Sequence, residues 1–572
     1  MASHPWEEFY SAKAKAFNAD ELPTLHLGTL MKKAAKEYEE RLACTTVLPN
    51  GAKGSLTYDR LDFHSDNLAI FLREELKLDQ GDVVAIMSPN CNGYPVASFG
   101  VFKSGCISTN INPLYTEPEM EHQLQDSNAK ALIVIDMFGD KVDAVIGKTN
   151  VKHVITLSVV DFFPGLKASI IGFILKYVKK VVPPMRTKRT KLELALKIGM
   201  SHRISKDIKT RHYAETVDPD DTAVYQYTGG TTGRSKGAEL SHRSVLANAF
   251  QMVAAIDDEN MPKEVHGLVA LPLYHIFAFT FSMINGLLQG YHAVMVPSPR
   301  PPSNLKPVFD KYPISVFPAV NTLFAALPKE EWFTPEIAGK LTHCVAGGTA
   351  LQEAVAQEWK EKYDVTIFQG YGLTESSCAL TVIPQTRPKL NSIGLPLPGI
   401  DIKIVDDEGK EVPVGEPGEL IAKGPNIMKG YLGRPEETAA TIKDGWLYTG
   451  DVAKMDEEGY FFIVDRMKDM ILVSGFNVYP NEVEDAIAHM GGVAEVAVIG
   501  VPDDQSGEAP KAFVVKANEG LTDTEVIEHC KGYLTGYKRP KEVEFIDEIP
   551  KSPVGKLLRK ELRAMEMAKR EK

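Results

Sequence analysis

Strand and helix patterns alternate along roughly the first 330 residues, and no other feature constrains the fold of this chain more. Short β-branched runs occur at 82–87, 131–136, 151–157 and 291–297, with amphipathic stretches such as 58–76 between them. Parallel strands need long crossover connections, which are usually helices. The alternation therefore predicts an α/β fold in which helices pack on the faces of parallel sheets.

The pattern changes at about residue 390. Short strands separated by Gly, Pro and Asp follow, which predicts a β-rich subdomain over about 390–466. A second strand–helix pattern begins after Arg466 and is long enough for an independent domain. We therefore expect a large N-terminal domain, 1–466, and a small mobile α/β domain, 467–572.

Charge and composition exclude several classes of protein. The net charge of −12 disfavours a general nucleic-acid binder, which needs a basic footprint. The six cysteines form no CxxC pair, which favours a reducing compartment over a zinc ribbon or a disulfide scaffold. The N-terminus lacks the apolar core of a secretory signal, and no apolar run is long enough to span a bilayer. We expect a cytoplasmic protein; the oligomeric state stays open, a homodimer included.

One basic segment departs from this acidic background. Residues 167–211 contain thirteen Lys or Arg and two acidic residues, a net charge of +11. Their first part, 169–182, mixes large aliphatic residues with lysines and is too short and too charged to cross a membrane. Two interpretations stay open: peripheral contact with an anionic inner membrane face, or a packed helix followed by a solvated basic loop.

A dense group of glycines and hydroxyl residues lies in YQYTGGTTGRSKGA, 225–238. Glycines let backbone N–H groups approach phosphate oxygens, hydroxyls add donors, and a lysine adds charge. The order Ser-Lys-Gly differs from the Gly-Lys-Ser/Thr of a Walker A loop. The composition indicates a polyphosphate site, and the alternative is a flexible turn after a strand. Its candidate residues are Thr228, Gly229, Gly230, Thr231, Thr232, Gly233, Ser235 and Lys236.

Five other stretches combine chemistry-bearing residues: LPLYHIFAFT (271–280), CVAGGTAL (344–351), QGYGLTES (369–376), GWLYTGD (445–451) and DRMKDMILVSGFNVYP (465–480). Taken singly, each has a structural interpretation. His275 is compatible with a satisfied core histidine, Asp451 with a turn beside Gly450, and Lys556 with a solvated lysine.

Together with PKSPVGK (550–556), these motifs in this order resemble the adenylate-forming superfamily of acyl-CoA synthetases, luciferase-type enzymes and peptide-synthetase adenylation domains. The resemblance extends from about residue 25 to 565. Within the superfamily, QYTGGTTG, LPLYHIFAFT and DRMKDMILVSGFNVYPNEVED are most similar to bacterial long-chain fatty acid–CoA ligases.

The resemblance implies a two-step reaction with fatty acid, ATP and coenzyme A as substrates and Mg²⁺ as cofactor. A carboxylate attacks the α-phosphate of ATP to give acyl-adenylate and pyrophosphate, and the thiol of coenzyme A then displaces AMP. A medium-chain or aromatic acid, or transfer of the acyl group to another acceptor, stays open. A non-enzymatic binding protein is disfavoured by the intact Lys556, Glu375 and Asp451.

The resemblance also assigns residue roles. Lys556 is the catalytic lysine, with Thr228, His275 and Glu375 in the catalytic group; Glu375 and Thr228 hold Mg²⁺, and Lys468 is the hinge. Besides the polyphosphate residues and Lys556, ATP is bound by Gly347, Gly348, Gln369, Gly370, Tyr371, Gly372, Thr374, Asp451 and Arg466. Coenzyme A is bound by Ser474, Gly475 and Phe476. The acyl pocket is formed by Phe317, Val320, Phe324 and Gly372, where the glycine leaves a deep path open.

Overall fold

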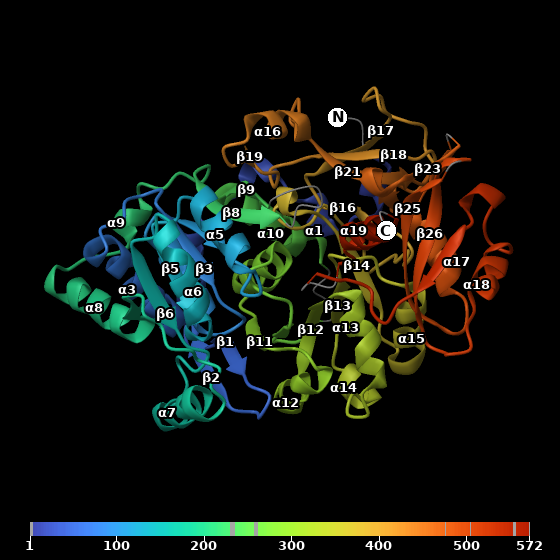
Figure 1. Cartoon of the computed structure of the whole chain (residues 1–572). Coiled ribbons are helices and arrows are strands. Elements are labelled where there is room, and N and C mark those ends of the chain that lie inside the picture. The colour runs from blue at the N-terminus through green and yellow to red at the C-terminus, as the bar shows by residue number, and fades with distance from the viewer. Residues whose placement is uncertain are drawn as a thin grey trace.

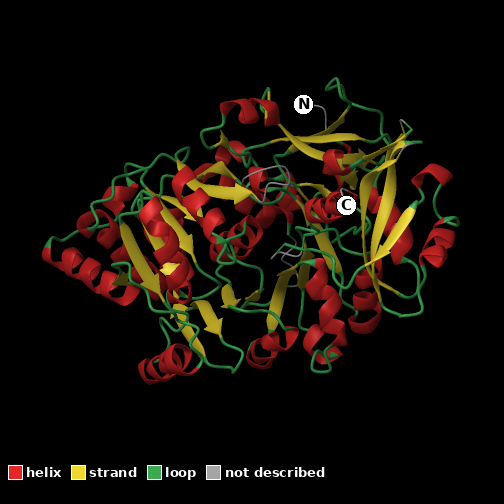
Figure 2. Cartoon of the chain, viewed as in Figure 1, coloured by secondary structure: helices red, strands yellow, loops and turns green. Residues whose placement is uncertain are grey.

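The computed structural model describes residues 4–23, 25–228, 235–256, 261–474, 476–503, 505–552 and 556–570. Their strands form four sheets, of nine, eight, five and five strands. The first part of the chain, coloured blue to green, fills the left of Figure 1, and the red C-terminal part lies at the right. Helices cover the faces of these sheets (Figure 2), as the alternating sequence pattern predicts.

The eight-stranded sheet has a parallel body with the order β8-β4-β3-β5-β6-β7. Its strands are β3 (Val83–Met87), β4 (Ile107–Asn110), β5 (Ala131–Ile135), β6 (His153–Leu157), β7 (Thr190–Lys191) and β8 (Thr222–Thr228). The flanking helices include α3 (Tyr58–Ile70), α4 (Gly93–Lys103), α5 (Glu117–Asp126), α6 (Gly139–Val145) and α8 (Leu192–Ser205). β9 (Lys236–Ser241) pairs antiparallel with β8 and places Lys236 opposite Thr228.

The nine-stranded sheet carries the cavity described below. Its parallel strands are β1 (Leu42–Val47), β10 (His266–Val269), β11 (His292–Met295), β12 (Ile314–Ala319), β13 (His343–Ala346) and β14 (Ile367–Tyr371). β2 (Lys53–Thr57) closes one edge by antiparallel pairing with β1. Because the six strands are parallel, their amino ends share one edge of the sheet and their carboxyl ends the other.

Helices on both faces of this sheet complete the layer. α10 (His242–Ala255) packs against the π-helix η7 (Ala278–Asn285). On the other face of the sheet, an aromatic core lies under the helices α13 (Asn321–Ala326), α14 (Pro335–Ala338) and α15 (Glu353–Tyr363). Each fully buried phenylalanine there contributes about 1.5–3 kcal/mol to stability. The members of this core include Phe309, Phe317, Phe324, Phe333 and Trp359.

The two smaller sheets come from the C-terminal third. One contains β17 (Asp401–Val405), β18 (Gly418–Lys423), β20 (Ile442–Lys443), β21 (Trp446–Met455) and β22 (Phe461–Arg466), all antiparallel. The other contains β23 (Ile471–Val473), β24 (Phe476–Val478), β25 (Val493–Asp503), β26 (Gly507–Lys516) and β27 (Glu542–Phe545), with helices α17 (Pro480–Ala488), α18 (Asp523–Cys530) and α19 (Arg559–Arg570). The predicted fold class is confirmed, while the division at residue 466 stays a prediction.

The basic segment begins with a projecting helix. α7 (Gly165–Phe173) continues into the π-helical turn η6 (Ile174–Val178) and lies at the lower edge of Figure 1, below β2. Neither element has a buried residue. The following helix α8 instead buries Leu192, Ala195, Leu196 and Gly199 and packs against α3. Within the described ranges, no helix has the length and apolar content needed to cross a bilayer.

Candidate active site

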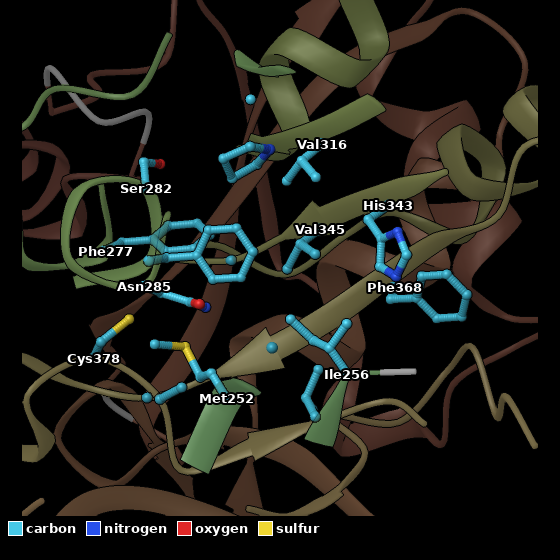
Figure 3. A pocket seen from close by; sticks show the side chains of 18 of the residues that line it. Met252, Ile256, Phe277, Ser282, Asn285, Val316, His343, Val345, Phe368 and Cys378 are labelled. Atoms are coloured by element: carbon cyan, nitrogen blue, oxygen red, sulfur yellow. The ribbon is translucent and has the colours of Figure 1, made fainter. Parts of the chain in front are cut away.

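A cavity lies between the nine-stranded sheet and the helices η7 and α10 (Figure 3). At one end it is lined by Gly347, Gly348 and Tyr371, at the carboxyl ends of β13 and β14. At the other end it is lined by His292 and His343, which begin β11 and β13. The cavity therefore runs along the strands. Apolar side chains form much of its wall, and those labelled in Figure 3 include Met252, Ile256, Phe277, Val316, Val345 and Phe368.

Lys556 lines the same cavity although it comes from the C-terminal part of the chain. Its backbone N–H donates to Ser552 Oγ at 3.1 Å, and Ser552 N–H donates to the Lys556 carbonyl at 2.8 Å. Burial and the nearby Arg466 lower the pKa of the Lys556 ammonium, while Asp451 and Glu375 oppose that shift. A lysine held in this way can bring a positive charge to a developing anion inside the cavity.

His275 lies in the cavity wall as a neutral ring. Burial, with repulsion from Lys556, lowers its pKa to about 3. The backbone N–H of Phe277 donates to His275 Nδ1 at 3.3 Å, which leaves the proton on Nε2. His275 can therefore donate a hydrogen bond, and it carries no charge at neutral pH.

Tyr371, Asp451 and Arg466 form a connected group. β21 and β22 pair so that Asp451 lies directly opposite Arg466. Tyr371 Oη donates to Asp451 Oδ2 at 2.6 Å, and Arg466 Nε lies 3.2 Å from Asp451 Oδ1. Burial and the charge of Asp451 raise the pKa of the Tyr371 hydroxyl well above its usual value. Each oxygen of the buried carboxylate keeps a lone pair that can accept a ligand hydroxyl.

A second polar group surrounds Glu375, which follows Thr374 in a short 3₁₀ turn. Tyr431 Oη donates to Glu375 Oε1 at 2.7 Å. Lys236 Nζ lies 5.2 Å from the centre of the Tyr431 ring and forms an ion pair with Glu437. Tyr431 thus connects the predicted Mg²⁺ ligand to the last residue of the predicted polyphosphate site.

Glu375 fits a magnesium site of the kind completed by substrate. Among the described residues, no cluster of three or more His, Cys, Asp or Glu side chains could hold a metal by itself. Mg²⁺ in nucleotide sites is usually bound by one or two carboxylates together with phosphate oxygens. Glu375 with the Thr228 hydroxyl and ATP is compatible with that donor set.

The loop after β13 requires its glycines. A Cβ atom at Gly347 would lie 2.9 Å from the Phe277 ring, and Gly348 has a φ of +77°. Gln369 fixes this loop, because its Oε1 accepts from the backbone N–H of Leu351 at 3.0 Å. Its Nε2 donates to the Leu390 carbonyl at 3.1 Å. The main chain around Gly347 and Gly348 can therefore approach a flat ligand closely.

A family model described as AMP-binding enzyme matches residues 31–432, and one described as AMP-binding enzyme C-terminal domain matches residues 482–556. The chain belongs to the AMP-binding enzymes. The resemblance in the sequence motifs is confirmed.

Several curated AMP-binding enzymes are similar over nearly the whole chain. A long-chain-fatty-acid–CoA ligase of Yersinia pestis is 44% identical over 513 residues, which is 90% of this chain and 90% of that protein. The Haemophilus influenzae protein of the same name is 43% identical over 550 residues, 95% of each chain. A feruloyl-CoA synthase of Amycolatopsis is 32% identical over 512 residues, 89% of this chain and 94% of that one.

Solved structures agree with this fold. ATP-bound MatB from Rhodopseudomonas palustris superposes with a TM-score of 0.80 at 27% identity, over 94% of this chain and 98% of that one. The anthranilate CoA ligase AuaEII with anthranoyl-AMP gives a TM-score of 0.83 at 24% identity, over 96% and 99%.

The structure corrects the predicted acyl wall of this AMP-binding enzyme. Phe317 and Phe324 do not line the cavity but are fully buried in the aromatic core under α13 and α15. Successive residues of a strand face opposite sides, so Val316 and Pro318 face the cavity instead. Val320 is buried after the end of β12, near Gly348, and does not line the cavity either.

The expectation for Gly372 also needs correction. Gly372 lines the cavity, but a Cβ there would lie 1.9 Å from the Cys378 carbonyl oxygen. Main chain therefore occupies the direction that a side chain would take. Glycine is required here for close packing of two backbone segments, and it does not leave a deep path open.

The predicted hinge and coenzyme A residues lie elsewhere. Lys468 is in the 3₁₀ turn Met467–Asp469 between β22 and β23, where burial and Arg466 lower its pKa to about 8. Phe476 is 57% exposed and stacks on Tyr537 at 4.8 Å. Neither Ser474 nor Phe476 lines the cavity that contains Lys556. Gly229, Gly230, Thr231, Thr232, Gly233 and Gly475 lie outside the described residues.

Sequence reasoning missed much of the cavity wall. Met252 and Ile256 come from α10 and its end, and Phe277, Ser282 and Asn285 from the helical segment that contains η7. Val316 and Pro318 were missed because Ile314–Ala319 is buried on both faces, so alternation along the strand does not show which face meets the cavity. The run AFTFSMIN places Thr280, Ser282 and Asn285 among apolar residues without a clear helical period, so the sequence does not show which side faces a ligand.

Proposed function

We propose that this protein is a long-chain fatty acid–CoA ligase. The observation that carries the proposal is its 44% identity over 90% of its length to ligases of that name, together with a cavity that joins Lys556 to apolar walls. Aliphatic and aromatic side chains suit a methylene chain, since each buried CH₂ contributes about 0.8 kcal/mol. The polar end holds groups that suit a nucleotide.

In this proposal, adenylation takes place at the polar end of the cavity. The fatty acid carboxylate attacks the α-phosphate, and negative charge builds on that phosphate and on the departing pyrophosphate. Lys556 stabilises this charge, while Thr374 and the neutral His275 donate hydrogen bonds nearby. Asp451 accepts from the ribose hydroxyls, and Tyr371 lies against the adenine. Mg²⁺ held by Glu375 and Thr228 would neutralise phosphate charge.

Thioester formation requires a different arrangement of the C-terminal domain. Ser474 and Phe476, the proposed coenzyme A residues, lie outside the cavity while Lys556 lines it. We propose that the domain turns about Lys468 after adenylation and replaces Lys556 by the part of the chain that contains Ser474 and Phe476. A few residues in a connecting turn are sufficient to absorb such a change in backbone angles.

An acid panel tests this function. Purified protein is supplied with MgATP, coenzyme A and palmitate, decanoate, acetate or ferulate, and the thioester is quantified by mass spectrometry. Palmitoyl-CoA should form with a kcat/KM well above that for acetate. A preference for ferulate would replace the proposal by an aromatic acid ligase. AMP formation with palmitate but no thioester would indicate a different acyl acceptor.

Peripheral membrane binding through the basic segment is a further part of the proposal. α7 and η6 expose a helical stripe of large apolar residues, among them Leu166 at 77% and Phe173 at 59%. Its members are Leu166, Ile170, Phe173, Ile174, Tyr177 and Val178, and the exposed Val181 follows the helix. Lys167, Lys176, Lys179 and Lys180 lie in the same segment. An apolar stripe beside lysines fits the interface of an anionic bilayer.

The position of this stripe supports the same idea. Phe163, two residues before α7, packs directly on Gly54 of β2. β2 pairs with β1, and β1 pairs with β11, whose first residue His292 lines the cavity. The helix is thus attached to the edge of the sheet that carries the acyl cavity, where membrane-dissolved fatty acids would be close.

Vesicle sedimentation tests membrane binding. Wild-type protein should co-sediment with phosphatidylglycerol-containing vesicles at low salt and dissociate at high salt. The triple variant Ile170→Ser, Phe173→Ser, Tyr177→Ser should lose binding, as should neutral replacement of Lys176, Lys179 and Lys180. The double variant Leu194→Ser, Ile204→Ser on α8 removes exposed apolar residues outside the stripe and should bind normally. Failure of wild-type protein to sediment at low salt would refute the proposal.

A further inference from the structure

The part of the acyl cavity near the amino ends of the strands is polar, although its walls are largely apolar. Four lining residues form this polar floor: Asn285, Gln289, His292 and His343. His292 and His343 begin parallel strands, whereas Gly347 follows the opposite end of β13. His343 and Gly347 are four positions apart along the chain, so the floor lies about 13 Å from the nucleotide end.

Both ring nitrogens of His292 already have hydrogen-bond partners within the protein. His292 Nε2 lies 2.7 Å from Thr45 Oγ1, and its Nδ1 lies 2.8 Å from His266 Nδ1. Burial lowers the pKa of His292 to about 3, with His266 and Lys53 adding to the shift. His292 therefore shapes the floor as a neutral ring and has no ring nitrogen left for a ligand.

Asn285 is different. It is the last residue of η7, and Gln289 follows one helical turn later. Gln289 Nε2 donates to Asn285 Oδ1 at 2.7 Å, which fixes the plane of the Asn285 amide. Among the described residues, Asn285 Nδ2 donates to no protein acceptor, and it is not enclosed as a buried unpaired atom. Figure 3 shows the Asn285 side chain directed into the cavity.

A donor amide at the end of an apolar cavity selects for a particular ligand. The walls before it, such as Met252, Ile256, Val316 and Val345, are apolar and suit methylene groups. A polar group that faces hydrocarbon alone loses its hydrogen bond to water without replacement. Burying a second carboxylate among these apolar walls would cost more than burying a neutral group, so the partner of Asn285 Nδ2 is a neutral oxygen such as a hydroxyl or keto group.

We infer that this site activates fatty acids that carry a hydroxyl or keto oxygen about ten carbons from the carboxylate, the number of carbons that covers the 13 Å given by the strand rise. Asn285 Nδ2 donates to that oxygen, and Gln289 positions the amide. This inference rests on the proposed ligase function and extends its substrate class. Asn285 is a specificity-determining residue for the acyl chain, remote from the reacting atoms.

The test compares 10-hydroxydecanoate with decanoate as substrates of the same protein. Wild-type enzyme should use the two acids with kcat/KM values within about tenfold, because the hydrogen bond offsets the desolvation of the hydroxyl. Asn285→Leu should lower the hydroxydecanoate-to-decanoate ratio about tenfold, mainly through KM. Gln289→Leu should lower the ratio by a smaller factor, and it provides a second measurement should Asn285→Leu fail to fold.

A matched control variant and two possible outcomes distinguish the role of Asn285 from the proposed ligase function. Asn150→Leu alters an exposed amide that bonds Asn128, and it should leave the ratio unchanged. A wild-type preference for decanoate above about 100-fold, or an unchanged ratio in Asn285→Leu, would overturn the inference. Activity with decanoate and palmitate would still support the ligase function in that case. Absence of thioester from every acid would instead overturn the ligase function itself.

Discussion

Replacement of Tyr371 by phenylalanine removes a single hydroxyl from the proposed ribose site. That hydroxyl donates to Asp451 Oδ2 at 2.6 Å, and Asp451 is only 4% exposed. A hydrogen bond to a charged group is worth about 1.5–3 kcal/mol, a factor of about 10–100. Arg466 still neutralises the carboxylate in the variant. We therefore expect the lower part of that range, about a tenfold loss in kcat/KM for ATP.

Palmitate-dependent exchange of radiolabelled pyrophosphate into ATP measures this loss in the first half-reaction alone. Tyr363→Phe provides a matched control, because its hydroxyl donates to the Phe333 carbonyl within the aromatic core, away from the cavity. Tyr363→Phe should leave kcat/KM for ATP unchanged. A Tyr371→Phe enzyme within twofold of wild type would show that Asp451 is not held for nucleotide binding.

Four further predictions concern Lys556, Glu375 and Phe324. Lys556→Ala should abolish adenylation yet form thioester from supplied palmitoyl-adenylate; equal loss of both steps would make the lysine structural. Glu375→Gln should raise the Mg²⁺ concentration required for half-maximal activity while fatty acid binding by fluorescence displacement stays normal. Phe324→Ala should destabilise the fold by about 3–5 kcal/mol in urea titration yet leave the chain-length profile unchanged, because the ring lies in the core. Because the pKa of Lys556 is lowered and the ammonium is the active form, adenylation should fall as pH rises through a value below that of an ordinary lysine; Lys556→Arg should shift this limb upward.

The alternating pattern predicts the fold class because parallel strands and crossover helices have different periodicities that remain visible in the sequence. It cannot decide which face of β12 meets the cavity. Ile314–Ala319 is buried on both faces, and its one polar residue, Ser315, is buried as well, so no alternation of polar and apolar residues marks a face. Phe317 was therefore predicted for the cavity, while Val316 and Pro318 line it.

The polar end of the site could be assigned only through the family motifs. Tyr371 and Asp451 are 80 residues apart, and their contact depends on how the β14 and β21 sheets pack together. No local sequence pattern predicts a contact between two residues so far apart in the chain. The Asn285–Gln289 contact is local instead, because the two residues are four positions apart and this helical spacing is visible in the sequence. Its meaning emerges only once the strands place it at the far end of the cavity.

Isotope transfer from labelled palmitate tests the central claim most directly. Palmitate with ¹⁸O in both carboxylate positions is incubated with the enzyme, MgATP and coenzyme A, and the products are analysed by mass spectrometry. Attack of the carboxylate on the α-phosphate, followed by thiol displacement, leaves one ¹⁸O in AMP and one in the palmitoyl-CoA carbonyl. That distribution is the predicted result. Label in inorganic phosphate, with ADP as the nucleotide product, would contradict an acyl-adenylate mechanism.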